Sequence, residues 1–534
     1  MVGRMKRAGP RSRPPAAIGR RQLLAGAGAL AAVGWLASPP ARIASAQPKV
    51  RGYPFPLGVA SGDPMPDGFV IWTRLAPDPL QGGGMPAEPV AVDWQVASDE
   101  KMTRVVRKGT ATARPEEGHS LHVELSGLEP GRWYWYRFRL GAEASRVGRT
   151  RTAPVAGAPL DRFRFAFASC QHWEQGYYSS YRHMLDDDLD LVIHLGDYIY
   201  ENPSWADEVR RHEGPKPATL GEFRNRHALY KTDPDLQAAH ARYPWAVTWD
   251  DHEVENDYAN DQSQNREEPQ AFLRRRAAAY QAYWEHMPLR RAAMPQGPNM
   301  RLFHRLTFGD LVEFHVVDGR QYRSVQPCTE TGPRGGGRLI EGCAARTAAS
   351  QTMLGVEQER WLSRGLERSR ARWNVVAQQQ LMAELRQKNA SGRLAHWSDG
   401  WDGYAAARGR LLGQIAAQRS MNAVVIGGDI HSFWVTDLKA DFANPDSPTV
   451  ATEFVGTSIT SLGVPYQTFA GFLPENPHVR YFESRHRGYA RCLVTPGRWT
   501  TDLRVVSDVR DQNASARTLA SFVVEAGRPG AVTA

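Results

Sequence analysis

Short apolar runs separated by turn-forming residues dominate the first part of the chain. The runs are residues 69–72, 90–96 and 133–138. Two of them follow the pairs Asp67-Gly68 and Pro130-Gly131, which mark turns between strands. Because alternation of apolar and polar positions without a helical period is typical of strands, we predict a small β-sandwich over residues 47–155.

Beyond residue 160 the spacing of the apolar positions changes. Short apolar runs alternate with longer stretches of helical character, such as residues 270–285 and 356–370. Such alternation indicates α/β layers. The expected fold class is therefore α/β (α+β), with the N-terminal β-sandwich followed by a layered domain over residues 160–520.

Several apolar runs end abruptly in polar side chains. The polar residues that follow them are Cys170-Gln171-His172, Asp197, Asp250-Asp251-His252-Glu253, Asp318, Gln378-Gln379-Gln380 and Asp429-Ile430-His431. In open α/β sheets, ligands bind outside the carboxyl ends of the strands. We therefore expect these strand ends to converge on one binding site.

The residue types at these strand ends favour metal ions. One strand that ends in Asp is ordinary, because Asp often caps a helix, but carboxylates, His, a thiol and a Tyr together are not. Oxygen ligands favour Ca²⁺, Mg²⁺ or Mn²⁺, whereas thiolate and imidazole favour Fe or Zn. The mixed set predicts unlike metals that share a bridging carboxylate. Sites with several metals suit phosphoryl transfer.

Composition and charge exclude several classes of protein. With 42% hydrophobic and 23% charged residues, the 534-residue chain is neither disordered nor collagen-like. Of its 66 Lys and Arg residues, eight lie within residues 1–46, which hold no acidic residue, so the rest of the chain is close to neutral. This distribution argues against a stable nucleic-acid complex. P-loop and G-x-S-x-G motifs are also absent from the sequence.

Residues 1–46 have the pattern of a cleaved export signal. Arg20-Arg21 precede a weakly apolar run, residues 25–37, and Ala44-Ser45-Ala46 forms an A-x-A cleavage site before Gln47. The run is short of the ~20 residues that span a membrane. The paired arginines predict the twin-arginine export machinery as a partner and a periplasmic or secreted location.

Export also bears on the four cysteines, because an exported protein can oxidise them. Cys328 and Cys343 flank a Gly-rich stretch, residues 332–342, and are candidates to pair. Cys492 has no obvious partner.

Four motifs of the chain resemble those of a known family. They are Phe167-Ala168-Ser169-Cys170-Gln171, Gly196-Asp197-Tyr198-Ile199-Tyr200-Glu201, Asp250-Asp251-His252-Glu253-Val254-Glu255-Asn256 and Gly428-Asp429-Ile430-His431. Their order and content resemble the PhoD-type alkaline phosphatases of the calcineurin-like metallophosphoesterase superfamily. The resemblance implies a four-layer αββα catalytic domain and hydrolysis of phosphomonoesters and phosphodiesters, with Fe³⁺ and Ca²⁺ as cofactors.

The same resemblance implies a set of ligands. Those that match the iron ligands are Cys170, Asp197, Tyr200 and His431, and those that match the calcium ligands are Asn256 and Asp429. Asp197 would bridge the two metals. Either Asp250 or Asp251 joins the set, and we take Asp251 as the candidate.

Two further residues are candidates for catalysis. His252 would bind the phosphoryl oxygens or protonate the leaving alkoxide; the alternative is a structural hydrogen-bonded His. Arg408 would clamp phosphate; the alternative is a residue of a structural turn.

We therefore expect an exported alkaline phosphatase that hydrolyses small-molecule phosphate esters through a metal-activated hydroxide. One alternative is a phospholipase D-like phosphodiesterase that acts on phospholipid, which a broad apolar wall near the site would favour. An alternative of another class is a non-catalytic binding protein whose metals are purely structural. Turnover of a phosphodiester that a chelator abolishes would separate these classes.

Overall fold

The computed structural model describes residues 50–534 apart from residues 205–207, 331–333, 419–421 and 445. The predicted export signal, residues 1–46, lies outside the described residues. The described residues belong to one compact unit. In the described part of the chain, no helix is both long enough and apolar enough to cross a bilayer.

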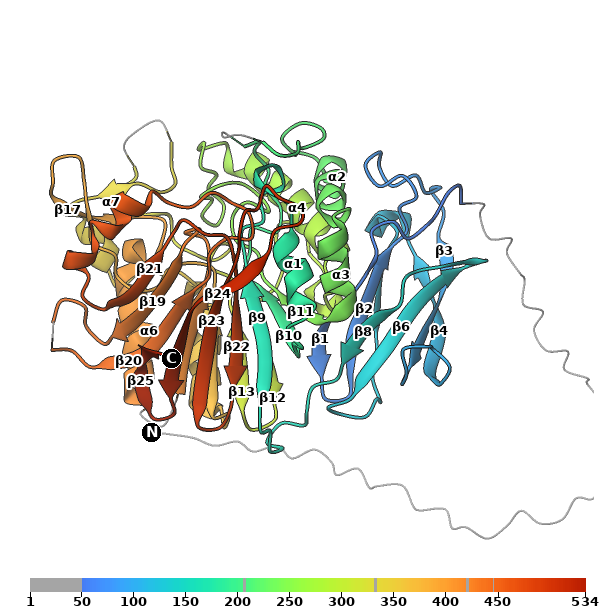
Figure 1. The fold of residues 1–534 in the computed structure, drawn as a ribbon. Coiled ribbons are helices and arrows are strands. Elements are labelled where there is room, and N and C mark those ends of the chain that lie inside the picture. The colour runs from blue at the N-terminus through green and yellow to red at the C-terminus, as the bar shows by residue number, and fades with distance from the viewer. Residues whose placement is uncertain (1–49, 205–207, 331–333, 419–421, 445) are drawn as a thin grey trace, which may run out of the picture. The chain divides into compact units, whose positions relative to one another are not determined.

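The larger of two central sheets has ten strands. Their bounds are β1 Val59–Met65, β2 Gly68–Arg74, β5 Ser120–Glu124, β9 Phe163–Ala168, β10 Leu191–His194, β11 Pro244–Val247, β22 Gly488–Val494, β23 Arg498–Val506, β24 Ala516–Glu525 and β25 Arg528–Thr533. They lie in the order β25-β24-β23-β22-β9-β10-β11-β1-β2-β5 (Figure 1). The four strands β9, β10, β11 and β1 run parallel.

The smaller central sheet has seven strands. Their bounds are β12 His304–Phe308, β13 Val312–Val316, β15 Trp373–Ala377, β18 Asn422–Gly427, β19 Phe433–Lys439, β20 Thr449–Val455 and β21 Val479–Glu483. They lie in the order β12-β13-β15-β18-β20-β19-β21. Strands β13, β15, β18 and β20 run parallel, so their carboxyl ends meet at one edge.

Helices cover the outer faces of both sheets. The helices over the larger sheet are α1 Ser179–Met184, α2 Leu220–Lys231, α3 Pro234–Arg242 and α4 Pro269–His286, and those over the smaller sheet are α5 Gly355–Arg368 and α6 Ala405–Ala417. The predicted helices at 270–285 and 356–370 are thus α4 and α5. On α4, the side chain of Glu268 accepts from the first backbone amides, and Pro269 starts the helix.

The central strands are apolar on both faces because each face meets a different core. In β9, Phe165 and Phe167 pack between the two sheets, whereas Ala166 packs against the helices. In β15, Val375 points between the sheets and Val376 toward α5 and α6. The layers are therefore α, β, β and α, as predicted.

A β-sandwich forms the N-terminal part. Its outer sheet has β3 Val90–Ala97, β4 Val105–Ala113, β6 Trp133–Leu140, β7 Glu143–Ala144 and β8 Gly148–Arg151, in the order β4-β3-β6-β7 with β8 paired to β6. It packs against β1, β2 and β5. Those three strands also continue the larger central sheet, because β1 pairs with β11. The boundary between residues 155 and 160 stays a prediction.

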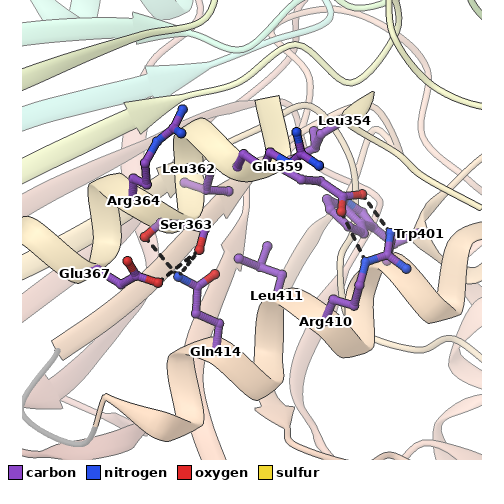
Figure 2. A pocket seen from close by; sticks show the side chains of 12 residues that line it. Leu354, Glu359, Leu362, Ser363, Arg364, Glu367, Trp401, Arg410, Leu411 and Gln414 are labelled. Carbon is purple, nitrogen blue, oxygen red and sulfur yellow. Dashed lines mark hydrogen bonds and ion pairs between the residues drawn. The ribbon is translucent and has the colours of Figure 1, made fainter. Parts of the chain in front are cut away.

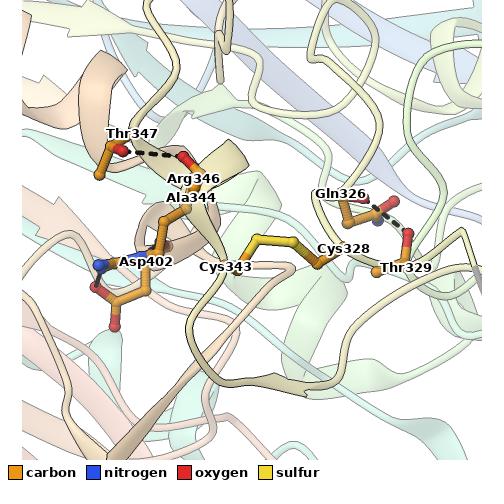
Figure 3. Close-up of a disulfide and its surroundings, with 8 residues drawn as sticks. All are labelled: Gln326, Cys328, Thr329, Cys343, Ala344, Arg346, Thr347 and Asp402. Carbon is orange, nitrogen blue, oxygen red and sulfur yellow. Dashed lines mark hydrogen bonds and ion pairs between the residues drawn. A yellow bond between two sulfur atoms is a disulfide. The ribbon is translucent and has the colours of Figure 1, made fainter.

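A small sheet and several short helices complete the described chain. The sheet has β14 Leu339–Ile340, β16 Gln387–Lys388 and β17 Leu394–Trp397, and the short helices are α7 Tyr466–Ala470, η1 Pro115–Glu117, η2 Trp173–Gln175, η3 Arg291–Ala293, η4 Ala344–Thr347, η5 Trp401–Tyr404 and η6 Leu473–Glu475. A disulfide joins Cys328 to Cys343 and closes the segment that carries β14 (Figure 3). The candidate pairing of these cysteines is thus confirmed, and Cys170 and Cys492 are free and buried.

Candidate metal centre

The loops that follow four central strands bring predicted ligands together. Cys170 follows β9, Asp197 follows β10, Asp251 follows β11, and Asp429 and His431 follow β18. Donor atoms of Cys170, Asp197 and His431 all lie within 4.8 Å of one another. The centre thus lies where the carboxyl ends of both sheets meet.

The backbone at four ligand positions lies in the left-handed region. The angle φ is 60° at Cys170, 56° at Asp197, 65° at Asp429 and 55° at His431. Such backbone costs a non-glycine residue about 1–3 kcal/mol and is concentrated at functional sites. The surrounding structure therefore holds these loops in one conformation.

Three donor groups converge beside Cys170. The Tyr200 hydroxyl donates to Asp197 Oδ2 at 2.9 Å and lies 3.1 Å from His431 Nε2. On its other side, the His431 ring donates from Nδ1 to the Leu462 carbonyl at 2.8 Å. That bond leaves Nε2 with a lone pair directed at the other donors.

The chemistry of these donors fits a bound cation. Burial, and after it the Asp197 carboxylate, raises the pKa of the Cys170 thiol and of the Tyr200 hydroxyl well above their usual values. Both groups bind metals as anions. A cation between them would stabilise both anions, so the donor set fits a metal ion.

Further carboxylates adjoin Asp251. Donor atoms within 4.8 Å of one another form the sets Asp197-Asp251-His252, Asp250-Asp251-Asp429 and Asp251-Asp257-Asp399. Two buried oxygens, Asp250 Oδ2 and Asp251 Oδ1, have no hydrogen-bond partner among the described residues. Because burying an unpaired carboxylate oxygen is costly, this side of the centre fits hard cations.

Glu201 connects His252 to Asn256. It accepts from His252 Nδ1 at 2.7 Å and from the backbone amide of Asn256 at 2.9 Å, and its side chain is fully buried. The His252 ring also stacks on Tyr200, with the ring centroids 4.2 Å apart. These contacts fix the ring and leave Nε2 as its second donor.

The charge of His252 follows from its neighbours. Burial opposes protonation, but Glu201, Asp251 and Asp197 together hold the pKa of His252 well above its usual value. These carboxylates favour the doubly protonated ring, which is the form that can donate to a phosphoryl or leaving oxygen.

A cavity of ≈ 380 Å³ opens onto the centre. Its polar wall contains Asp197, Asp251, His252, Asn256, Asp257, Asp399, Asp429 and His431, and its apolar wall contains Leu339, Leu381, Leu385, Trp397, Trp401, Ile430, Val464 and Phe469. Within the described residues, no Lys or Arg lines this cavity. Among the described lining residues, His252 is thus the side chain whose raised pKa favours a positive charge.

A second cavity, of ≈ 320 Å³, lies between α5 and α6 and has Trp401 in its wall as well (Figure 2). Its polar side chains pair with one another: Arg410 with Glu359 at 2.8 Å, and Gln414 with Ser363 at 2.8 Å. In the described chain, none of its lining residues is a predicted ligand, so the centre belongs to the first cavity.

Arg408 lies apart from the ligand cluster. Its guanidinium donates to Asp402 Oδ1 at 2.6 Å, to Glu384 Oε2 at 3.2 Å and to the Met382 carbonyl at 3.2 Å. These acceptors engage the guanidinium, and Arg408 does not line the cavity in the described chain. Its role as a phosphate clamp stays a prediction.

Sequence reasoning did not single out several residues of the centre. They are Glu201, Asp257, Arg320 and Asp399, which all contact predicted ligands or lie among them. Arg320 had a signal, because it stands two residues after Asp318 at the end of β13. Asp399 follows β17, which has only four residues. A strand this short shows no clear alternation of apolar and polar positions, so the sequence pattern does not reveal it.

Comparisons with known proteins agree with this geometry. The PhoD-like phosphatase family matches residues 165–503, and the PhoD-like phosphatase N-terminal domain matches residues 41–154. Alkaline phosphatase D of Bacillus subtilis (strain 168) is 48% identical over 494 residues, which cover 91% of this chain and 83% of that protein. A solved structure of PhoD has a TM-score of 0.86 and 47% identity, covering 91% of this chain and 93% of that chain.

The layered fold and the clustered ligands, together with these relatives, define a metal-dependent phosphoric ester hydrolase. The chain belongs to the PhoD-like phosphatase family. The resemblance drawn from the four motifs is thus confirmed.

Proposed function

We propose that this PhoD-like phosphatase uses iron and calcium at the centre and hydrolyses phosphomonoesters and phosphodiesters outside the cytoplasm. One observation carries the proposal: the donor atoms of Cys170, Asp197 and His431 lie within 4.8 Å of one another, beside a group of carboxylates. Bound metal ions supply Lewis acidity, which lowers the pKa of water and neutralises charge on phosphate.

The chemistry of the donors supports the assignment of each metal. A thiolate, a phenolate and an imidazole beside Asp197 suit iron in its oxidised state, whereas carboxylate and amide oxygens suit calcium. We assign Cys170, Asp197, Tyr200 and His431 to iron, and Asp197, Asp251, Asn256 and Asp429 to calcium. Asp251 is preferred to Asp250 because Asp251 lines the cavity, whereas Asp250 pairs with Arg320 and does not appear in the described cavity wall.

His252 acts as the proton donor in this proposal. Glu201 holds the ring at the cavity wall with Nδ1 engaged, so Nε2 is free to donate to the leaving oxygen or to bind a phosphoryl oxygen. The apolar residues of the same cavity would exclude water from the leaving group.

That apolar wall also favours a second candidate substrate. The wall has Leu339, Trp397 and Phe469 and, in the described residues, no Lys or Arg. A phosphodiester carries one negative charge where a phosphomonoester carries two, and an apolar alcohol would contact this wall. A phospholipase D-like activity on a phospholipid is therefore our alternative.

Export completes the proposal. The paired arginines and the A-x-A site in residues 1–46 support transport by the twin-arginine machinery to the periplasm or the medium. Processing after Ala46, read from the N-terminal sequence of the exported protein, is the expected result. Export that persists after Arg20→Lys and Arg21→Lys together would contradict this route.

Metal analysis of protein exported with its signal intact tests the centre. We expect iron and calcium in the wild type, and loss of both metals and of turnover in Asp197→Ala. Asp437→Ala, at a buried carboxylate of β19 that pairs with Arg480 outside the ligand cluster, is the matched control that should keep both metals. Undiminished activity in Asp197→Ala would remove Asp197 from the site.

A further inference from the structure

The guanidinium of Arg320 lies among four carboxylates of the centre. Its Nη1 donates to Asp399 Oδ2 at 2.8 Å, and its Nε donates to Asp250 Oδ1. Its Nη2 lies 3.4 Å from Asp251 Oδ2 and 3.5 Å from Asp429 Oδ1. Only 1% of the side chain is exposed, so Arg320 lies behind the cavity wall rather than in contact with a substrate.

The surroundings fix this guanidinium. The backbone of Arg320 donates to Asp318 Oδ1 at 2.9 Å and accepts from the amide of Asn260 at 3.0 Å. Asp399 is held in turn by Arg323 and by Gln326, whose Nε2 donates to it at 2.7 Å. The guanidinium of Arg320, a planar fork of N–H donors, is therefore held in place by its partners.

The contacts of the fork are unequal. Asp250 and Asp399 each receive a hydrogen bond from it, whereas Asp251 and Asp429 lie beside Nη2 without one. The latter two carboxylates keep lone pairs for another cation. One nitrogen of the fork, Nη2, therefore lies within 3.5 Å of both carboxylates.

We propose that Arg320 is a positioning residue for calcium: it engages Asp250 and Asp399 and holds Asp251 and Asp429 at the spacing that the ion takes. This inference rests on the proposed function, because it takes Asp251 and Asp429 as calcium ligands. Partners that orient metal ligands typically contribute about 10–100-fold in metal affinity.

Two substitutions separate position from charge. Arg320→Met removes both the fork and its charge, whereas Arg320→Lys keeps the charge but cannot reach four carboxylates from one plane. If Arg320 positions the ligands, both variants bind calcium more weakly. If it only offsets charge, Arg320→Lys resembles the wild type and Arg320→Met binds calcium more tightly.

The experiment is a calcium titration of the full iron-loaded enzyme against a competing chelator. We expect the calcium Kd to rise about 10–100-fold in Arg320→Met and in Arg320→Lys, with the visible absorption of the iron site unchanged. Arg74→Met is the matched control. Arg74 is also buried, but it bonds to the Gly118 carbonyl at 2.8 Å and to His286 rather than to the carboxylates of the centre. Its calcium Kd should equal that of the wild type.

Two results are decisive. An unchanged or lower calcium Kd in folded Arg320→Lys would overturn the inference, and this variant carries the test if Arg320→Met does not fold. A wild type that binds no calcium would instead overturn the proposed metal assignment, so the two failures are distinguishable.

Discussion

Glu253 and Gly196 allow the loop after β10 and the loop after β11 to lie against each other. Glu253 accepts from the backbone amides of Tyr198 at 2.6 Å and of Asp250 at 2.9 Å, and so ties the loop after β10 to the loop after β11. Gly196 permits this close contact. Its φ is 112°, and an added Cβ would lie 2.4 Å from the Asp250 amide nitrogen.

Gly196→Ala should therefore disrupt the centre. The methyl group would push the Asp197 loop away from Asp250 in a backbone conformation that alanine rarely adopts. We expect a lower melting temperature and loss of bound metal, measured by thermal unfolding and by elemental analysis. Gly221→Ala is the control: nothing lies within 4 Å of its added Cβ, and alanine favours the helix by up to about 1 kcal/mol.

His252→Gln should lower kcat by an amount that depends on the leaving group of the ester. Loss of a general acid slows a reaction by about 10²–10⁴-fold when the leaving alkoxide needs a proton, but a nitrophenolate leaves without one. We therefore expect a large fall in kcat for an alkyl phosphodiester and a smaller fall for a nitrophenyl ester. Equal losses on both substrates would show that His252 binds phosphate rather than donating a proton.

At the level of elements, the small sheet forms part of the cavity wall. Leu339 of β14 and Trp397 of β17 pair with each other and both line the cavity. The Gly337 amide donates to Asp257 Oδ2 at 2.8 Å, which links the same segment to the carboxylates. The disulfide Cys328–Cys343 closes this segment, so we expect it to affect both stability and substrate binding (Figure 3).

Replacing both cysteines by serine should loosen that wall. A disulfide across 15 residues contributes about 3 kcal/mol by restricting the unfolded chain. We expect a lower free energy of unfolding and a higher KM, with bound iron retained. Cys492→Ala, at a buried cysteine outside the disulfide, should leave KM unchanged; an unchanged KM in the double variant would exclude the segment from substrate binding.

The elements also explain which parts of the centre were predictable. Asp197, Asp251 and Asp429 directly follow buried parallel strands, and the carboxyl ends of such strands converge, so their proximity follows from the local pattern. Glu201 and Arg320 bond to partners far along the chain. The strand end beside Asp318 marked the place of Arg320, but a linear pattern does not show which residues either side chain contacts. Arg408 was proposed because a guanidinium can clamp phosphate, and its ion pairs with Asp402 and Glu384 depend on the tertiary fold.

For the molecule as a whole, the centre concentrates negative charge. The clustered carboxylates are Asp197, Asp250, Asp251, Asp257, Asp399 and Asp429, and the guanidinium groups paired with them are those of Arg320 and Arg323. The excess of negative charge opposes folding unless cations bind. The stability of the whole chain should therefore depend on metal.

Removal of metal should lower the melting temperature. A ligand that binds only the folded state stabilises it by about 2.7 kcal/mol at a concentration of 100 Kd, so calcium added after a chelator should restore the transition. Calorimetry with and without chelator measures this. Asp197→Asn should respond less, because it lacks the proposed bridging ligand; an identical melting temperature with and without metal would contradict the dependence.

The N-terminal sandwich should not be separable from the catalytic layers. The sequence predicted a distinct domain before residue 155, but β1 pairs with β11, and Trp72 Nε1 donates to the Glu285 carbonyl at 3.0 Å. Removing residues 1–155 would expose the edge of β11 and the face of α4, since β1, β2 and β5 continue the sheet there. We expect the fragment 156–534 to aggregate and the mature chain to unfold in one calorimetric transition. A soluble fragment that binds metal and turns over substrate would show that the catalytic layers fold alone.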